Sequence, residues 1–219
     1  MKFLSAQNAA ALDRDLMSIG AFSIDQLMEL AGLVLPMLMR NPRDLGGDGL
    51  VAARHLWHYG YQPTVYYPKQ SKNELYQRLS TQLKNLNVPF TDDFPSALQD
   101  SDHVVDAIFG FSFSGPLRSP FPAVINALQE TSLPVTSVDA PSSWDIETGP
   151  PSSGPGSTFN PAVLVSLTAP KPLVRYFKGR HFIGGRFVSP GIREKYDLEL
   201  PEYEGVDQVV EVGREGEKL

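Results

Sequence analysis

The chain has 219 residues, of which 42% are hydrophobic and 20% are charged, values that suit one large soluble domain. Its net charge of -6, without a basic block, argues against nucleic acid or an anionic membrane as a partner. The absence of cysteine excludes disulfides, thiolate zinc sites and a cysteine nucleophile.

Neither a membrane span nor a targeting peptide is predicted from the N-terminal part of the sequence. The longest apolar stretch, Gly32 to Met39, is too short to cross a bilayer. Asp13 and Asp15 lie near the N-terminus, whereas secretory signals and transit peptides are basic and poor in acids. We expect a cytoplasmic protein, and a mitochondrial form would need an N-terminal extension.

Helices are predicted at the start of the chain. Apolar residues at helical spacing, among them Ala9, Leu12 and Leu16, predict a helix from Ser5 to Ile19. Ser23-Ile24-Asp25-Gln26 fits a capping box, so a second helix is expected to begin there. Its side chains expected to point inward are Ile24, Leu27, Met28 and Leu30.

Strands and helices alternate through the rest of the sequence. Helices are predicted at Asp48–Tyr59 (ended by Gly60), Ser71–Leu86 and Pro122–Gln129. Strands are predicted at Thr64–Tyr67, His103–Phe109, Pro134–Asp139 and Ala162–Leu167, with Phe182–Val188 as a candidate edge strand. This order predicts an α/β fold, with a mostly parallel central sheet and helices on both faces. We expect one domain over residues 1–210 and an acidic, disordered tail over residues 211–219.

Three segments come at the ends of predicted strands or before a helix, where ligands bind in open parallel sheets. The first is the glycine turn Gly46-Gly47-Asp48-Gly49, whose glycines let a ligand approach the backbone and whose following helix favours anions. Glycine turns before helices are common, so this segment alone is weak support for a site.

The second segment begins at Asp106, a carboxylate within an apolar strand, where it costs free energy unless it is paired or holds a cation. A solvated strand end is the alternative explanation. The residues that follow, Gly110 to Gly115, combine backbone and hydroxyl donors with two phenylalanines. This combination suits a phosphate beside a ring, although the aromatic residues could instead pack into the core.

The third segment begins at Asp139, which ends its strand before a tight Pro-Ser turn. A carboxylate at a strand end in a cleft is a frequent acid/base position, although one such Asp is more often a cap. The four histidines, His55, His58, His103 and His181, are interpreted as surface or packing residues and not as a metal site.

Six motifs, in order along the chain, resemble one known family. They are FSIDQLMELAG, GGDGLVAARHL, YGYQPTVYYPK, VVDAIFGFSFSG, SVDAPSSWD and SLTAPKP. Together they resemble the NAD(P)H-hydrate epimerases of the YjeF N-terminal domain family, eukaryotic type, from about Phe3 to about Val210.

The resemblance implies a Rossmann-like three-layer sandwich and a homodimer that interconverts the R and S forms of hydrated NADH and NADPH (NADHX and NADPHX). It implies a bound potassium ion (K+) with Asp106 and Ser142 as ligands. It implies Asp139 as a substrate-contacting carboxylate, which we interpret as catalytic. The residues implied to contact the substrate are Gly46, Gly47, Asp48, Gly110, Phe111, Ser112, Phe113, Ser114, Gly115, Pro116 and Asp139.

The implied chemistry fits these residue types. The damaged cofactor is a carbinolamine, with a hydroxyl on the ring carbon next to nitrogen. We expect Asp139 to help the hydroxyl leave as water, so that water can return to either face of the planar cation. Potassium is a hard cation and prefers oxygen ligands.

The sequence departs from the family pattern before the glycine turn. The family has a buried strand followed by GPGNNGGDG, whereas this chain reads LVLPMLMRNPRDLGGDG, with Asp44 and Leu45 in place of the two asparagines. Pro36 is poorly tolerated in a central strand, so the first strand and the start of the loop are predicted to be missing, as a skipped exon would leave them. Ser143 also replaces the glycine of the usual PSGW turn.

Two further functions are weighed against an epimerase. Damage to the glycine loop favours a catalytically impaired domain of the same fold that binds a nucleotide or a protein. An ordinary Rossmann dehydrogenase is disfavoured, because a G-x-G-x-x-G fingerprint after a first strand is missing.

Overall fold

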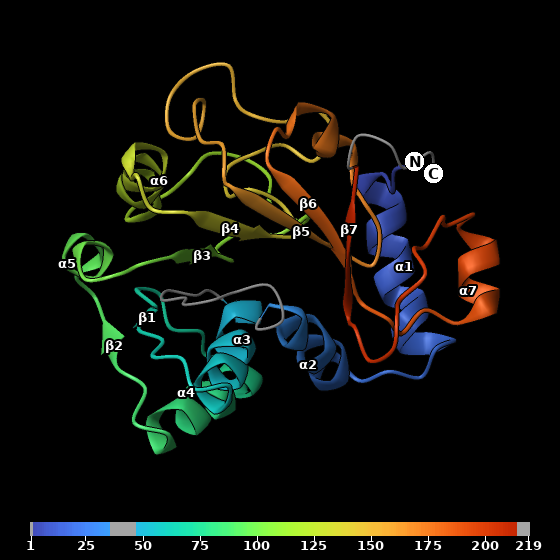
Figure 1. The fold of residues 1–219 in the computed structure, drawn as a ribbon, viewed down its shortest axis with the longest axis horizontal. Coiled ribbons are helices and arrows are strands. Elements are labelled where there is room, and N and C mark those ends of the chain that lie inside the picture. Colours follow the sequence, from blue (N-terminus) through green and yellow to red (C-terminus); the bar gives the residue numbers. More distant parts are fainter. Residues whose placement is uncertain (1, 36–46, 214–219) are drawn as a thin grey trace.

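The computed structural model describes residues 2–35 and 47–213 (Figure 1). Its helices are α1 (Ala6–Ser18), α2 (Ile24–Val34), α3 (Gly47–His58), α4 (Glu74–Asn85), α5 (Phe94–Gln99), α6 (Phe121–Glu130) and α7 (Pro190–Lys195), with a 3-10 helix η1 (Pro172–Tyr176). Its strands are β1 (Val65–Tyr66), β2 (Phe90–Thr91), β3 (Val104–Asp106), β4 (Val135–Val138), β5 (Val163–Leu167), β6 (Arg180–Gly184) and β7 (Val209–Val212).

The first two helices begin where their side chains cap them. The Ser5 hydroxyl accepts a hydrogen bond from the Asn8 N–H and begins α1. At α2, the Ser23 hydroxyl accepts from the Gln26 N–H, and the Gln26 side chain accepts from the Ser23 N–H. The predicted capping box is therefore confirmed.

The main sheet has five strands in the order β3-β4-β5-β6-β7. The first four are parallel to one another, and β7 pairs antiparallel with β6. The prediction of an edge strand at Phe182–Val188 is wrong, because β6 has a partner on each side. Strand β7 extends the sheet to Val212, two residues beyond the expected domain boundary, while residues 214–219 lie outside the described residues.

Strands β1 and β2 form a second, two-stranded parallel sheet. Within the described ranges, no strand joins β1 to β3, so the two sheets are separate. The segment of residues 36–46, where a first strand is predicted to be missing, lies outside the described residues.

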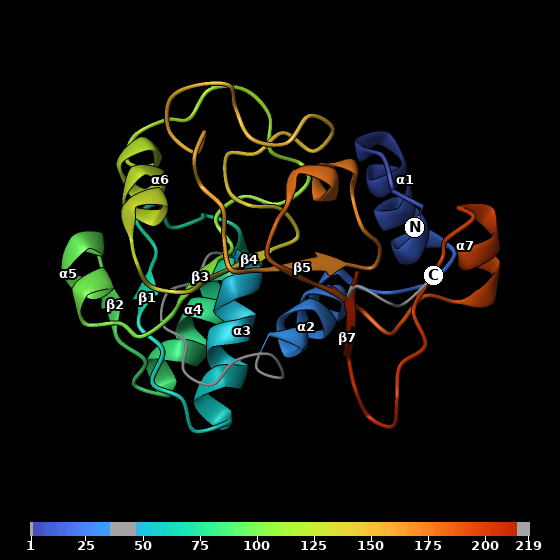
Figure 2. The same cartoon turned by 45° about the horizontal axis from the view of Figure 1, so that its top comes forward.

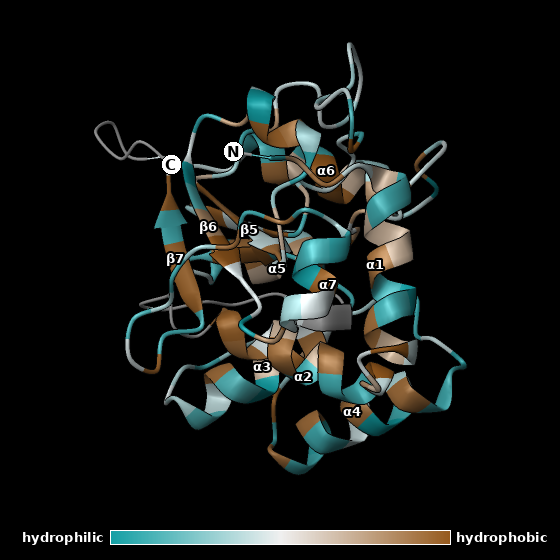
Figure 3. Ribbon diagram, turned by 90° about the vertical axis from the view of Figure 1, so that its right-hand side faces the viewer, coloured by the Kyte–Doolittle hydropathy of each residue, from teal (hydrophilic) through white to brown (hydrophobic). Residues whose placement is uncertain are grey.

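Helices α2, α3 and α4 cover one face of the main sheet, and α6 with the long loops and η1 covers the other (Figures 1 and 2). The first face buries Val105, Val138 and Val165 against α2 and α3. Hydrophobic residues concentrate on β5 and β6 and on the α2 and α3 surfaces below them (Figure 3). Because side chains alternate along a strand, Asp106, Ser137 and Ser166 point to the opposite face.

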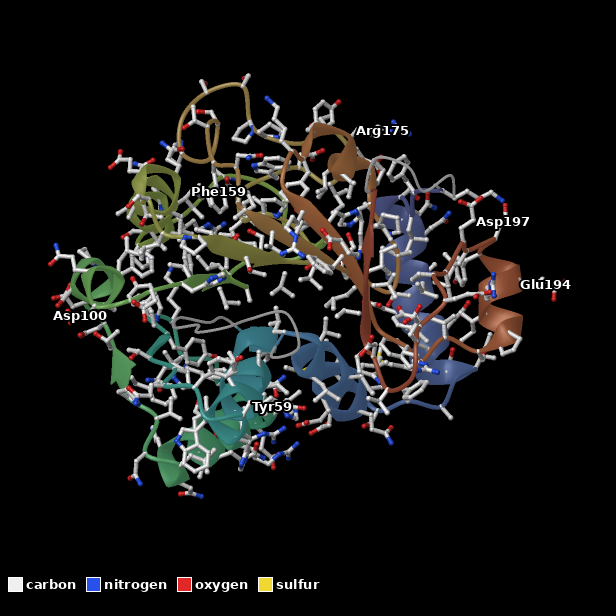
Figure 4. The ribbon with its side chains drawn as sticks, in the orientation of Figure 1. Tyr59, Asp100, Phe159, Arg175, Glu194 and Asp197 are labelled. Carbon is white, nitrogen blue, oxygen red and sulfur yellow. The ribbon has the colours of Figure 1, made fainter. Side chains whose placement is uncertain are left out.

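The prediction that Ile24 points inward is wrong, since this side chain is 49% exposed at the start of α2. Met28, Ala31 and Val34 form the buried face of that helix instead. Figure 4 shows the contrast between inside and outside, with Phe159 within the fold and Glu194 on the outer side of α7. No helix in the described ranges combines the length and hydropathy needed to cross a membrane.

Candidate active site

The carboxyl ends of β3, β4 and β5 lie side by side, because these strands are parallel neighbours in register. Asp106 pairs with Ser137 across β3 and β4, and Val138 pairs with Val165 across β4 and β5. The strand arrows point toward α1 (Figure 1). The segments that follow these strands therefore meet at one edge of the sheet.

Asp139 directly follows β4 and is only 5% exposed. Its φ of 65° lies in the left-handed region, which Asp tolerates better than most residues. The Lys171 ammonium forms an ion pair with Oδ1 of Asp139, and the Phe111 N–H donates to Oδ2 at 2.9 Å. Both contacts stabilise a negative charge on this carboxylate.

Lys171 is held in the same place by a second contact. It precedes η1, is 3% exposed, and donates a further hydrogen bond from Nζ to the Leu167 carbonyl at 2.8 Å. Leu167 ends β5, so the lysine ties the end of this strand to the end of β4. A buried ion pair requires such additional hydrogen bonds, because both charges have lost water.

Asp106 ends β3 and is 1% exposed. Oδ2 accepts from the Ser137 hydroxyl at 2.7 Å and from the Ser142 N–H at 2.8 Å, and the Ser142 hydroxyl donates to Oδ1. Burial raises the pKa of Asp106, while hydrogen bonds from Ser142, Ser137 and Ile108 act in the opposite direction. Within the described residues, no cationic side chain contacts this carboxylate.

The donor set around Asp106 fits a monovalent cation. Carboxylate and hydroxyl oxygens converge there, and potassium is a hard ion that takes oxygen ligands. When ionised, a buried carboxylate that has only neutral partners is uncompensated, and a cation would neutralise it. In the described ranges, no three or more His, Cys, Asp or Glu residues form a cluster that could hold a metal ion.

A cavity of about 440 Å³ opens beside the Asp139–Lys171 pair. This volume falls in the range of small-molecule pockets. Its apolar wall comes from α1 and α2 and includes Leu12 and Met28. Its polar groups are Asp13, Ser112, Asp139, Thr168 and Lys171. The cavity therefore combines an apolar surface for a ring with convergent charged groups.

The predicted substrate residues divide into two groups. Gly110, Phe111, Ser112 and Asp139 line this cavity. Phe113 instead stacks on Phe109, with ring centroids 4.4 Å apart, and does not line it. Ser114, Gly115 and Pro116 do not line it either.

The predicted glycine turn is described only in part. Gly47 and Asp48 form the first residues of α3, and Gly46 lies outside the described residues. The two predicted metal ligands, Asp106 and Ser142, are in contact, because the Ser142 hydroxyl donates a hydrogen bond to the Asp106 carboxylate.

Three residues of the site were not predicted from sequence. Lys171 follows β5 within the SLTAPKP motif, and the strand-end argument used for Asp106 and Asp139 would have included it. Ser137 lies within β4, directly opposite Asp106 on β3. Asp13 is at helical spacing from the buried residues Ala9 and Leu16, and a carboxylate at such a position is a signal of a site.

The sequence of this chain is similar to a known family and to several named proteins. Residues 37–173 match the family model described as YjeF-related protein N-terminus. A protein from Sclerotinia sclerotiorum is 69% identical, over 96% of this chain and 95% of the relative. One from Fusarium vanettenii is 66% identical, over 100% of this chain and 99% of the relative. Both relatives are named NAD(P)H-hydrate epimerase.

The alignment with the Fusarium vanettenii relative extends over 234 positions, although this chain has 219 residues. The relative therefore has about 15 positions without a counterpart here. A missing strand and loop start would leave a difference of this size.

The crystal structure of the yeast protein ynu0 matches the fold with a TM-score of 0.89 and 36% sequence identity. The match covers 97% of this chain and 100% of the yeast chain. It confirms the predicted α/β fold with a mostly parallel central sheet. From the family model, the curated relatives and this structure, the chain belongs to the family of YjeF-related protein N-terminal domains.

Proposed function

We propose that this chain interconverts the R and S epimers of hydrated NADH and NADPH, an isomerase reaction that repairs damaged nicotinamide cofactors. Relatives at 50–69% identity carry the name NAD(P)H-hydrate epimerase. The structural observation that carries the proposal is the buried Asp139–Lys171 pair, which faces a cavity with apolar and polar walls.

The reaction requires that a hydroxyl leave as water and return. The ring nitrogen donates its electron pair to the adjacent carbon, the C–O bond breaks, and a planar cation results. Water then adds to either face and loses a proton. Asp139 transfers the proton to the departing hydroxyl oxygen or from the oxygen of the returning water, and a positioned carboxylate accelerates such a step by about 10²–10⁴.

Lys171 and the Phe111 N–H position Asp139 for this role. Each binds a different oxygen of the carboxylate, so its plane is fixed relative to the cavity. Because Asp139 and Lys171 are almost fully buried, bulk water does not screen their charges. The cavity wall from α1 and α2 excludes water from one side of the bound ring.

A potassium ion would be held by Asp106 and Ser142. When bound, it would supply the positive charge that the Asp106 carboxylate lacks. Ser142 also accepts a hydrogen bond from the Phe109 N–H at 3.1 Å, which couples this site to the substrate-facing loop. The proposed proton transfer by Asp139 does not involve the ion.

The remainder of the dinucleotide extends from the cavity. Gly110, Phe111 and Ser112 contact the nicotinamide part, and Phe113 to Pro116 contact the rest of the substrate. Gly46, Gly47 and Asp48 contribute backbone donors for its phosphates, since the N-terminus of a helix favours anions. The protein acts as a cytoplasmic homodimer with one folded domain, which includes β7 to Val212.

A catalytically impaired binding module is the second candidate. Two observations favour it, namely the separate β1–β2 sheet and the roughly 15 positions that the Fusarium vanettenii relative has in addition. Such a protein would bind a nucleotide in the same cavity without turnover.

The test starts from separated R and S epimers of hydrated NADH and follows their interconversion by chromatography. We expect catalysed equilibration by the wild-type chain and a loss of about 10²-fold or more in Asp139→Asn. A version of the chain that carries the relative's additional positions serves as the control. Catalysis only by that longer version would support the binding module, and full activity of Asp139→Asn would exclude the proposed role of this residue.

A further inference from the structure

Asp13 brings a second carboxyl group to the cavity from a separate element. It lies on α1 next to the buried Leu12, and it lines the same cavity as Asp139 and Lys171. Asp139 reaches the cavity from the end of β4, whereas Asp13 reaches it from the helix. The two carboxyl groups therefore approach a bound ring from different parts of the fold.

The side-chain carboxyl of Asp13 has no hydrogen bond or ion pair within the described ranges. Asp15, two residues further along the same helix, has a different role: Tyr196 donates to its carboxylate at 2.6 Å, and Lys195 pairs with it. A partly buried carboxyl in a cavity wall without a structural partner is available to a ligand.

The epimerisation has a requirement that one fixed carboxylate does not meet. The hydroxyl leaves from one face of the ring and returns to the other, so proton transfer is needed on both faces. Lys171 and the Phe111 N–H hold Asp139 in one orientation. A group in that orientation serves a single face of a ring that is bound beside it.

We infer that Asp13 is a second catalytic carboxyl, which transfers the proton on the face of the nicotinamide ring opposite to Asp139. This inference rests on the proposed epimerase function. In one direction, Asp13 gives its proton to the hydroxyl, the C–O bond breaks with its electron pair on oxygen, and water leaves. A second water then forms a C–O bond on the other face and gives a proton to Asp139. The reverse reaction exchanges the two roles.

The electrostatic surroundings of the two carboxyl groups support this division. Burial raises the pKa of Asp13; the charge of Lys171 acts against this rise, and that of Asp139 adds to it. A raised pKa keeps the proton on Asp13 to higher pH, as a proton donor requires. The other titratable groups that line the cavity are Tyr76 from α4, Asp139 and Lys171.

Isotope exchange in water labelled with ¹⁸O separates the two faces. Loss and return of water on the same face exchanges the hydroxyl oxygen without epimerisation, whereas return on the opposite face gives both. In Asp13→Asn we expect epimerisation to fall by about 10²-fold or more. Exchange should persist in the single epimer whose hydroxyl faces Asp139. Asp139→Asn should show the mirror image, with exchange retained in the other epimer.

Asp15→Asn is the matched control on the same helix, and it should keep epimerisation and both exchange reactions. Asp13→Glu tests the chemical group, and it should retain epimerisation with a shifted alkaline limb of its pH profile. In the wild type, activity should fall as pH rises through the pKa of Asp13, and Asp13→Asn should lack this limb.

Equal loss of exchange in both epimers in Asp13→Asn, or unchanged epimerisation, would overturn the assignment of Asp13 while leaving the proposed function intact. Lack of epimerisation by the wild-type protein would instead overturn the proposed function. The uncatalysed rate, measured without protein, is subtracted in every case.

Discussion

Asp106 and Asp139 end neighbouring strands at the same edge of the sheet, yet the fold compensates their charges differently. Asp106 has neutral donors, from Ser137 and Ser142, while Asp139 has the Lys171 ammonium. Both are nearly inaccessible, at 1% and 5% exposure. The position of a carboxylate at a strand end therefore does not determine its role. The groups that contact the carboxylate determine it.

The largest expected effect comes from removal of the Lys171 ammonium group, which pairs with Asp139. Lys171→Met leaves a buried carboxylate without its ion pair, and we expect a loss of about 3–5 kcal/mol in the free energy of unfolding. Urea unfolding measures this loss. Lys195→Met, which removes an exposed partner of Asp15, should cost about 1 kcal/mol or less. If both variants lose the same small free energy of unfolding, the buried Asp139–Lys171 pair stabilises the fold no more than the exposed pair does.

On the Asp106 side, the expected effect is a response to added cation. A ligand at 100 times its Kd stabilises the folded state by about 2.7 kcal/mol, and each kcal/mol shifts Tm by about 2–4 °C at this chain length. We expect potassium chloride to raise the Tm of the wild type relative to a matched salt of a large organic cation, and Asp106→Asn to abolish the difference. Asp145→Asn, whose carboxylate accepts only local hydrogen bonds near the surface, should retain the wild-type response. An identical response in Asp106→Asn would place the cation elsewhere.

His181 is a buried histidine of β6, and its burial makes the stability of the fold depend on pH. Burial, and then the charge of Lys171, lowers the pKa of His181 to about 4. Between its ordinary value of 6.5 and about 4, the unfolded chain binds a proton at this residue and the folded chain does not. The free energy of unfolding therefore decreases as pH falls through this window, by up to about 1.4 kcal/mol per pH unit.

The measurement compares the wild type with His181→Gln, which retains a group able to hydrogen-bond to Ser166. We expect the difference in free energy of unfolding between the two proteins to change with pH only below about 6.5. A difference that stays constant from pH 7 to pH 4 would show that His181 has the same pKa in the folded and the unfolded chain.

Local signals in the sequence were sufficient for much of the fold. The capping box at Ser23, and Gly60 with its φ of 88° after α3, determine helix ends within a few residues. Strand partners depend on distant segments, so β7 and the interior position of β6 were missed. Helix α5 and helix α7 are only six residues long and lack a full periodic pattern.

The candidate site shows the same division. Asp106 and Asp139 were found because each interrupts or ends an apolar strand. The same strand-end argument applies to Lys171, but its pairing with Asp139 joins residues 32 positions apart and depends on the register of β4 and β5. The sequence pattern identifies the sheet edge, but not which charges meet there.

The smallest expected effect concerns the turn that follows Asp139 and carries Ser142, which contacts Asp106. Ser143 has a φ of 80°, and its buried hydroxyl has no hydrogen-bond partner within the described residues. Ser143→Gly removes both the left-handed strain and the unpaired hydroxyl, against a cost in chain entropy of about 0.5–1 kcal/mol. We expect a net stabilisation of about 1 kcal/mol in urea unfolding. Ser132→Gly, at an exposed position without positive φ, should instead destabilise the protein slightly. If Ser143→Gly destabilises the protein as much as this control does, the serine stabilises the turn that carries Ser142, and the geometry around Asp106 depends on it.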